Sequence, residues 1–122
     1  MPSRHLLRVA SQLKFLVSTI IHRELNDPRI GFVTVLSVEP TEDFKEAKVL
    51  VSVLGGPGAE SRTLHGLDAA RAYIQKRIAK SVRLRHMPTL RFELDTSQRR
   101  TAQLETLIEE TRAEDRARRE ED

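Results

Sequence analysis

The sequence predicts an α+β domain in which helices cover one face of a small sheet. Apolar residues recur every three to four positions in two long segments and at about every second position in three short ones. The order along the chain is helix, strand, strand, helix, strand, helix. Elements in this order bury one sheet face under helices and leave the other face to solvent or to a partner.

Residues 3–25 are expected to form one amphipathic helix. Ser3 is suited to cap it, because a serine oxygen accepts hydrogen bonds from the N–H groups of a first helical turn. Apolar residues recur at helical spacing along the whole segment, which gives one buried face. Pro28 ends the helix, since the residue before a proline avoids the helical region.

Two strands are predicted next, over residues 30–39 and 45–54. Both are rich in β-branched residues, and a connection this short is typical of an antiparallel hairpin. The glycine-rich stretch 55–58 is expected to be a loop. It also matches the GxxG pattern of KH domains, but that clamp lies between two helices, whereas this stretch lies between a strand and a helix.

A second helix is predicted over residues 59–85 and a third strand over 89–95. Pro88 marks the change, because apolar residues recur every four positions before it and every two after it. The chain then becomes helical again, and its end has no large apolar residue, so we expect disorder or a frayed helix there. We therefore place a folded domain at residues 1–97 and a charged C-terminal helix with an acidic tail at 98–122.

Charge is divided unevenly along the chain. Residues 1–100 carry 17 Lys and Arg against 10 Asp and Glu, a net charge of +7, whereas residues 101–122 carry 4 against 8, a net −4. The basic body suggests an anionic partner, although +7 is also ordinary for a small soluble protein. One hypothesis is that the acidic tail screens the basic body.

Composition excludes several classes of protein. The chain has no cysteine, which excludes disulfides and thiolate metal sites. No apolar run approaches the roughly 20 residues of a membrane span, and the N-terminus becomes polar too early for a signal peptide. We expect a cytoplasmic protein that has no contact with membranes.

The strongest functional signal is the stretch 69–92, which contains seven Lys or Arg residues and no Asp or Glu. A helix that carries charge only for solubility would interleave Glu for i, i+4 pairs, so we predict binding of polyanion phosphates. Aromatic residues are sparse and mostly at core spacing, which favours recognition of RNA backbone and shape over stacking on bases. The predicted RNA-binding residues are Arg71, Lys76, Arg77, Lys80, Arg83 and Arg85, with Arg8, Lys14, Arg29, Lys45 and Lys48 as lesser candidates.

Catalysis has no support in the sequence. The four histidines lack i, i+4 spacing and metal-binding patterns, and no nucleophile elbow or phosphate loop is present. We expect a protein that is not an enzyme and uses no metal or cofactor; a nuclease is the enzymatic alternative. The other alternative is a protein-interaction module, in which the basic face meets an acidic protein or the open sheet face or edge pairs with a partner.

Short motifs in a fixed order add a family resemblance. They are Arg8-Val9-Ala10, Arg23-Glu24-Leu25, Asp27-Pro28-Arg29-Ile30-Gly31, Val33-Thr34, Val38, Asp43, Ala47-Lys48-Val49, Val51-Ser52, Arg83-Leu84-Arg85, Pro88, Leu90, Phe92 and Asp95. In this order and spacing, from residue 8 to residue 97, the chain resembles the ribosome-binding factor A family of bacterial assembly factors.

The resemblance implies a KH-like domain of the type II arrangement. In that family an Ala-x-Gly kink between two helices replaces the KH clamp, and the matching positions here are Ala70, Arg71 and Ala72. Alanine in place of glycine favours continued helix by about 1 kcal/mol, so only tertiary packing could impose a kink. We predict a bend near residues 70–73.

The resemblance also implies a function. Members of the family bind free 30S small ribosomal subunits, rather than translating ribosomes, through 16S rRNA. They promote late maturation of the subunit and processing of the 16S rRNA precursor, and in some bacteria they belong to the cold-adaptation response. An assembly GTPase helps to release them. They are not enzymes, and we expect a monomer.

Overall fold

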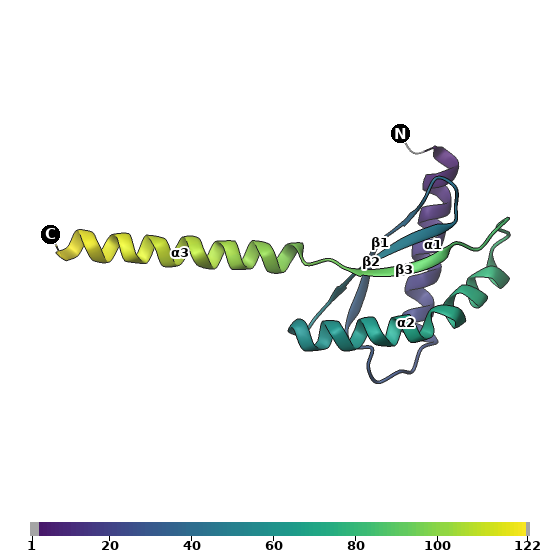
Figure 1. Ribbon diagram of the computed structural model, residues 1–122, viewed down its shortest axis with the longest axis horizontal. Helices are drawn as coiled ribbons and strands as arrows, with labels where there is room; N and C mark the ends of the chain where they lie inside the picture. The colour runs from purple at the N-terminus through teal and green to yellow at the C-terminus, as the bar shows by residue number, and fades with distance from the viewer. Residues whose placement is uncertain (1–2, 122) are drawn as a thin grey trace.

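The computed structural model describes the backbone of residues 3–121, and the side chains of all of these except 98–104 and 120–121. Its elements confirm the predicted α+β class and the KH-like order that the resemblance implied. They are α1 (Arg4–Arg23), β1 (Val33–Pro40), β2 (Glu46–Val53), α2 (Gly56–Ser81), β3 (Thr89–Leu94) and α3 (Ser97–Glu121). Figure 1 shows α1 and α2 beside the sheet and α3 extending away from it.

Helix α1 begins where its capping residue predicts. The Leu6 N–H donates to Ser3 Oγ at 3.1 Å, which satisfies one of the free donors of the first turn. One face of the helix is buried against the sheet and α2 through Val9, Leu13, Val17, Ile20 and Ile21. The apolar periodicity therefore placed this helix correctly.

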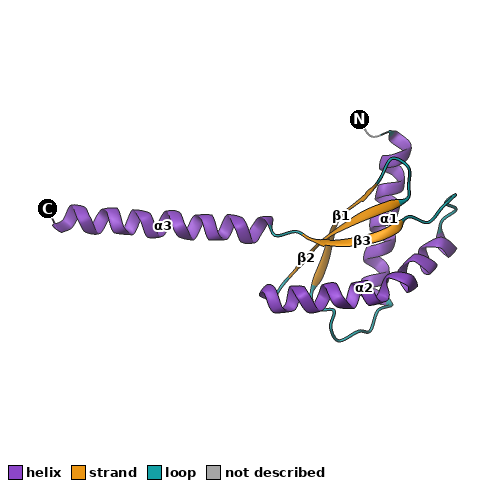
Figure 2. Ribbon diagram, in the orientation of Figure 1, coloured by secondary structure: helices purple, strands orange, loops and turns teal. Residues whose placement is uncertain are grey.

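The three strands form one sheet in the order β1-β2-β3 (Figure 2). The predicted hairpin is confirmed, since β1 and β2 pair antiparallel, and β3 pairs parallel to β2. Strand β1 contains a bulge at Leu36, because Val35 lies opposite Val51 while Ser37 lies opposite Leu50. The extra residue shifts the alternation by one, so Val35 and the later Val38 both face the core.

The opposite face of the sheet carries charges that pair with one another. Lys48 lies 3.0 Å from Glu39, while Arg91 lies 2.8 Å from Glu93 and 3.4 Å from Glu46. These pairs join neighbouring strands or neighbouring positions on one strand, as cross-strand pairs of opposite charge do. The charges in these pairs are therefore compensated within the sheet itself.

Helix α2 begins earlier than predicted. The stretch 55–58, expected to be a loop, contains the first turn of this helix, with Gly55 as its N-cap at φ 117°. Glycine adopts this left-handed conformation without a steric penalty. Pro57 is compatible with a first turn because the N–H it lacks would have no helical partner there. The glycines and the proline that suggested a loop are thus the residues with which the helix begins.

Helix α2 also ends earlier, at Ser81 rather than at residue 85. Val82 is extended (φ −135°, ψ 137°), and its N–H donates to the Ile78 carbonyl at 3.0 Å. Leaving the helix here lets Leu84 and Met87 pack against the core. The segment that follows, with two of the predicted cations, is therefore a loop rather than a helix surface.

Helix α2 is continuous from Gly56 to Ser81, so the two helices implied by the resemblance are one. Figure 1 shows the axis of α2 changing direction along its length. A helix that wraps around a core curves in this way without losing its hydrogen bonds. The assignment of the bend to Ala70, Arg71 and Ala72 remains a prediction.

Helix α3 continues to Glu121, through the stretch for which disorder or a frayed helix was expected. The side chains of residues 105–119 are all exposed. Within residues 3–121, no helix is long and apolar enough to cross a membrane. The boundary between domain and tail at residue 97 remains a prediction.

The loop after α1 is pinned to α2 at a buried threonine. Thr63 Oγ1 accepts from the Gly31 N–H at 3.2 Å and donates to the Arg29 carbonyl at 3.4 Å. One turn further along, a Cβ added to Gly66 would lie 2.7 Å from Ile30 Cγ1. The missing side chain at Gly66 therefore lets the loop lie directly against the helix.

We predict that Gly66→Ala lowers the free energy of unfolding. Overpacking at this contact costs about 1–3 kcal/mol, which exceeds the roughly 1 kcal/mol that alanine gains over glycine in a helix. Urea denaturation measures the difference. Gly58→Ala is the matched control, because its added Cβ meets only the flexible end of Arg62, at 3.3 Å. Equal stability of the two variants would contradict the close approach.

Candidate nucleic-acid interface

Ion pairs divide the predicted RNA-binding residues into two groups. The paired group consists of Arg29 with Asp27 at 2.6 Å, Arg71 with Asp68 and Arg77 with Glu24 at 2.7 Å each, and Lys48 with Glu39 at 3.0 Å. A neighbouring carboxylate repels an approaching phosphate, so these cations contribute less to phosphate binding. Within the described residues, the group without ion pairs is Arg8, Lys14, Lys45, Lys76, Lys80, Arg83 and Arg85.

Arg77 joins α2 to the end of α1. Its Nε donates to Glu24 Oε1 at 2.7 Å, and the Tyr73 hydroxyl donates to the same oxygen at 2.8 Å. These two hydrogen bonds, that from Arg77 foremost, hold the pKa of Glu24 below its ordinary value of 4.5. Arg77 is therefore a tertiary contact between two helices rather than a free surface cation.

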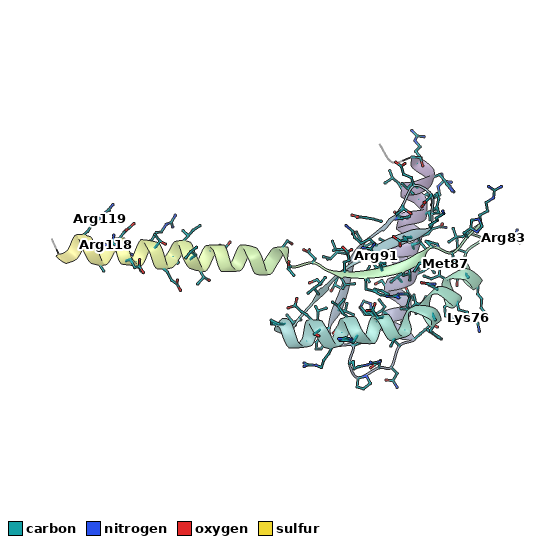
Figure 3. All side chains as sticks on the ribbon, in the orientation of Figure 1. Lys76, Arg83, Met87, Arg91, Arg118 and Arg119 are labelled. Carbon is teal, nitrogen blue, oxygen red and sulfur yellow. The ribbon has the colours of Figure 1, made fainter. Side chains whose placement is uncertain are left out.

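Four of the cations without ion pairs gather around the second half of α2. Lys76 and Lys80 lie one turn apart on its exposed face, and Arg83 and Arg85 lie exposed in the following loop. We call these four residues the basic end. Figure 3 shows Lys76 and Arg83 at one extremity of the molecule, opposite the end of α3. No acidic side chain of the described chain is ion-paired to any of the four.

Helix α1 provides a second basic surface. Its 20 residues contain no Asp or Glu, and Arg8 and Lys14 are both exposed on it. Lys45, the remaining lesser candidate, is exposed in the β1–β2 turn. The structure thus places exposed cations on α1, on α2 and on the loop that follows α2.

The acidic tail does not lie near the basic end. In Figure 3, Arg118 and Arg119 of α3 are at the opposite side of the molecule from Lys76 and Arg83. The hypothesis that the tail screens the basic body therefore has no support from this arrangement.

The histidines have structural contacts. His22 Nε2 lies 2.8 Å from the Val33 carbonyl oxygen, which ties α1 to β1. The ring centroid of His5 lies 5.7 Å from that of Phe44. Among the residues that the structure describes, no group of three or more His, Asp and Glu is arranged to hold a metal ion.

Two exposed aromatic residues were missed by the sequence analysis. Phe15 and Phe32 are 70% and 80% exposed, whereas Phe44 and Phe92 pack against the core. The signal for Phe15 was present, because it lies outside the apolar stripe of α1 while neighbouring Leu16 belongs to it. An aromatic residue on the polar face of a helix is available to a ligand.

Comparison with known proteins finds a family profile, sequence relatives and solved structures that share one description. The family profile described as "Ribosome-binding factor A" matches residues 5–108. A ribosome-binding factor A from Desulfitobacterium hafniense is 44% identical over 108 residues, which cover 88% of this chain and 86% of the relative. The crystal structure of ribosome-binding factor A from Thermus thermophilus matches with a TM-score of 0.67 and 28% identity, over 73% of this chain and 93% of that one.

A second structural match concerns a complex. It is a homology model of the Thermus thermophilus ribosome-binding factor A, fitted into the cryo-EM map of a 30S-RbfA complex. Its TM-score is 0.59 at 28% identity, covering 71% of this chain and 91% of that one.

We predict that Glu24→Gln removes a pH-dependent part of the stability. Because the folded-state pKa of Glu24 lies below its ordinary value, this stability is present above pH 4.5 and is lost as the pH falls through the folded-state pKa. The variant should melt at a lower temperature than the wild type at pH 7, and the difference should shrink below pH 4.5.

Thermal unfolding from pH 7 to pH 3 measures this difference. The control is Glu42→Gln in the β1–β2 turn, where Glu42 forms no ion pair among the described residues. A Glu24→Gln difference that stays constant over the whole pH range would show that the charge of Glu24 contributes nothing to its link with Arg77.

Proposed function

Because the chain belongs to the ribosome-binding factor A family, we propose that it binds the 30S small ribosomal subunit through phosphates of 16S rRNA. The observation that carries the proposal is the basic end, where Lys76, Lys80, Arg83 and Arg85 are exposed and have no ion pairs within the described chain. The relative fitted into a 30S complex supports the same partner.

The binding energy in this proposal comes mainly from counterion release. Each phosphate that a lysine or arginine neutralises adds about 0.7–0.9 to the slope of log affinity against log salt. Arg71 and Arg77, which the sequence ranked equally with the basic end, contribute less because their carboxylate partners already neutralise them. In this proposal, salt-dependent docking depends mainly on the four side chains of the basic end, and the exposed cations of α1 add to it.

We further propose that docking favours free, immature subunits and promotes their late maturation, including processing of the 16S rRNA precursor. The role is that of a bound factor in the cytoplasm rather than an enzyme. An assembly GTPase that remodels the rRNA surface would release it by separating the phosphates from the basic end. Such contacts release readily because each one is exposed and screened by salt.

The protein-interaction alternative is less well supported. It uses the open sheet face, whose Lys48 and Arg91 are already paired with carboxylates of the same sheet. That face therefore offers a partner little uncompensated charge.

We predict that the double substitution Lys76→Glu and Lys80→Glu weakens binding to small subunits by about tenfold at low salt. The slope of log affinity against log salt should fall by about 1.4–1.8, the share of two phosphate contacts. Co-sedimentation of purified protein with mature and with immature subunits, across a salt series, measures both quantities.

The matched control is Arg118→Glu with Arg119→Glu, which changes the net charge by the same amount at the far end of α3. It should leave the salt slope unchanged. Unaltered binding by the α2 variant would place the contact elsewhere. Equal binding of the wild type to mature and immature subunits would contradict the maturation role.

A further inference from the structure

Phe15 lies on the solvent side of α1. Neighbouring Leu13 and Val17 are fully buried, whereas the ring of Phe15 is 70% exposed. Burying a phenylalanine side chain stabilises a fold by about 1.5–3 kcal/mol, and most of that stabilisation is not realised here. The ring therefore does not serve the core of the domain.

The ring of Phe15 lies between two hollows of the surface. One, of about 480 Å³, runs along α1 and is lined by Ser11, Lys14, Phe15, Ser18, Thr19, His22 and Arg23. The other, of about 390 Å³, lies between α1 and the end of α2 and is lined by Ser11, Gln12, Phe15, Leu16, Ser81 and Val82. Both hollows are open to solvent, and the second has walls from two helices, so a flat ring could reach the exposed side of Phe15.

The second hollow borders the basic end. Ser81 and Val82, which line it, are the sequence neighbours of Lys80 and Arg83. The first hollow is bordered by Lys14 and Arg23, on a helix without acidic residues. An exposed aromatic ring thus has cations of α1 beside it, and the basic end begins next to the residues that line its second hollow.

The residues around Phe15 favour a nucleobase over a protein partner as the ligand of the ring. A protein partner would need a wide, exposed apolar patch around the ring. Beside Phe15, Leu16 and Val82 are half-buried rather than exposed. Leu7, the other large apolar side chain that α1 exposes, is eight residues from Phe15, about 12 Å along the axis. A nucleobase in a single strand presents a flat face and carries phosphates on both sides. Exposed aromatic rings with nearby cations bind such bases by stacking.

We propose that Phe15 stacks against an unpaired RNA base, while Lys14 and the basic-end residues Lys80 and Arg83 bind the flanking phosphates. This inference rests on the proposed function and adds to it a contact that discriminates single-stranded from duplex RNA. It adds base stacking to the recognition of backbone and shape that the sequence favours.

The test uses an RNA hairpin with a single-stranded purine loop that carries 2-aminopurine, and a duplex with the same number of phosphates. Wild-type protein should bind the hairpin more tightly and quench the 2-aminopurine fluorescence. Phe15→Leu, which keeps an apolar side chain, should weaken hairpin binding about tenfold, abolish the quenching and leave duplex binding unchanged. Phe15→Trp should restore both the affinity and the quenching.

Phe32→Leu is the matched control, because Phe32 is equally exposed but lines neither hollow. It should behave as the wild type. Hairpin binding that is unchanged in Phe15→Leu overturns the stacking contact, and the proposed function stands if Lys76→Glu with Lys80→Glu still weakens binding. Equal losses on hairpin and duplex also overturn the stacking contact. Wild-type protein that binds neither RNA overturns both proposals.

Discussion

The packing of α2 across the sheet and against α1 is the constraint on which the rest of the molecule depends. Leu67, Ile74 and Ile78 are fully buried along one face of this helix. Lys76 and Lys80 each follow a buried isoleucine by two residues, which is about 200° around a helix. Burial of the isoleucines therefore turns these lysines to solvent. The orientation of α2 that builds the core is thus the orientation that exposes the candidate interface.

The same packing decides which cations are free. It brings Glu24, at the end of α1, within hydrogen-bonding distance of Tyr73 and Arg77 on α2. That contact converts one member of the basic stretch into a link between helices. The four residues of the basic end have no such partner among the described residues. Cations without a carboxylate partner are thereby concentrated at one end of α2 and in the loop that follows.

The candidate interface combines two kinds of contact with different consequences. The basic end provides salt-dependent attraction without information about the RNA, since phosphates are alike along any strand. In our proposal Phe15, which lies beside the end of α2, adds a surface on which an accessible base stacks.

The sequence by itself determined the order of the elements, the buried face of α1, the hairpin and the family, because periodicity and short motifs are local properties. Tertiary structure decided what depends on residues far apart. The pairing of Glu24 with Arg77 spans 53 residues, and no pattern within 69–92 reveals it. The end of α2 at Ser81 follows from packing of Leu84 against the core, and the site at Phe15 exists only because that helix end lies beside α1.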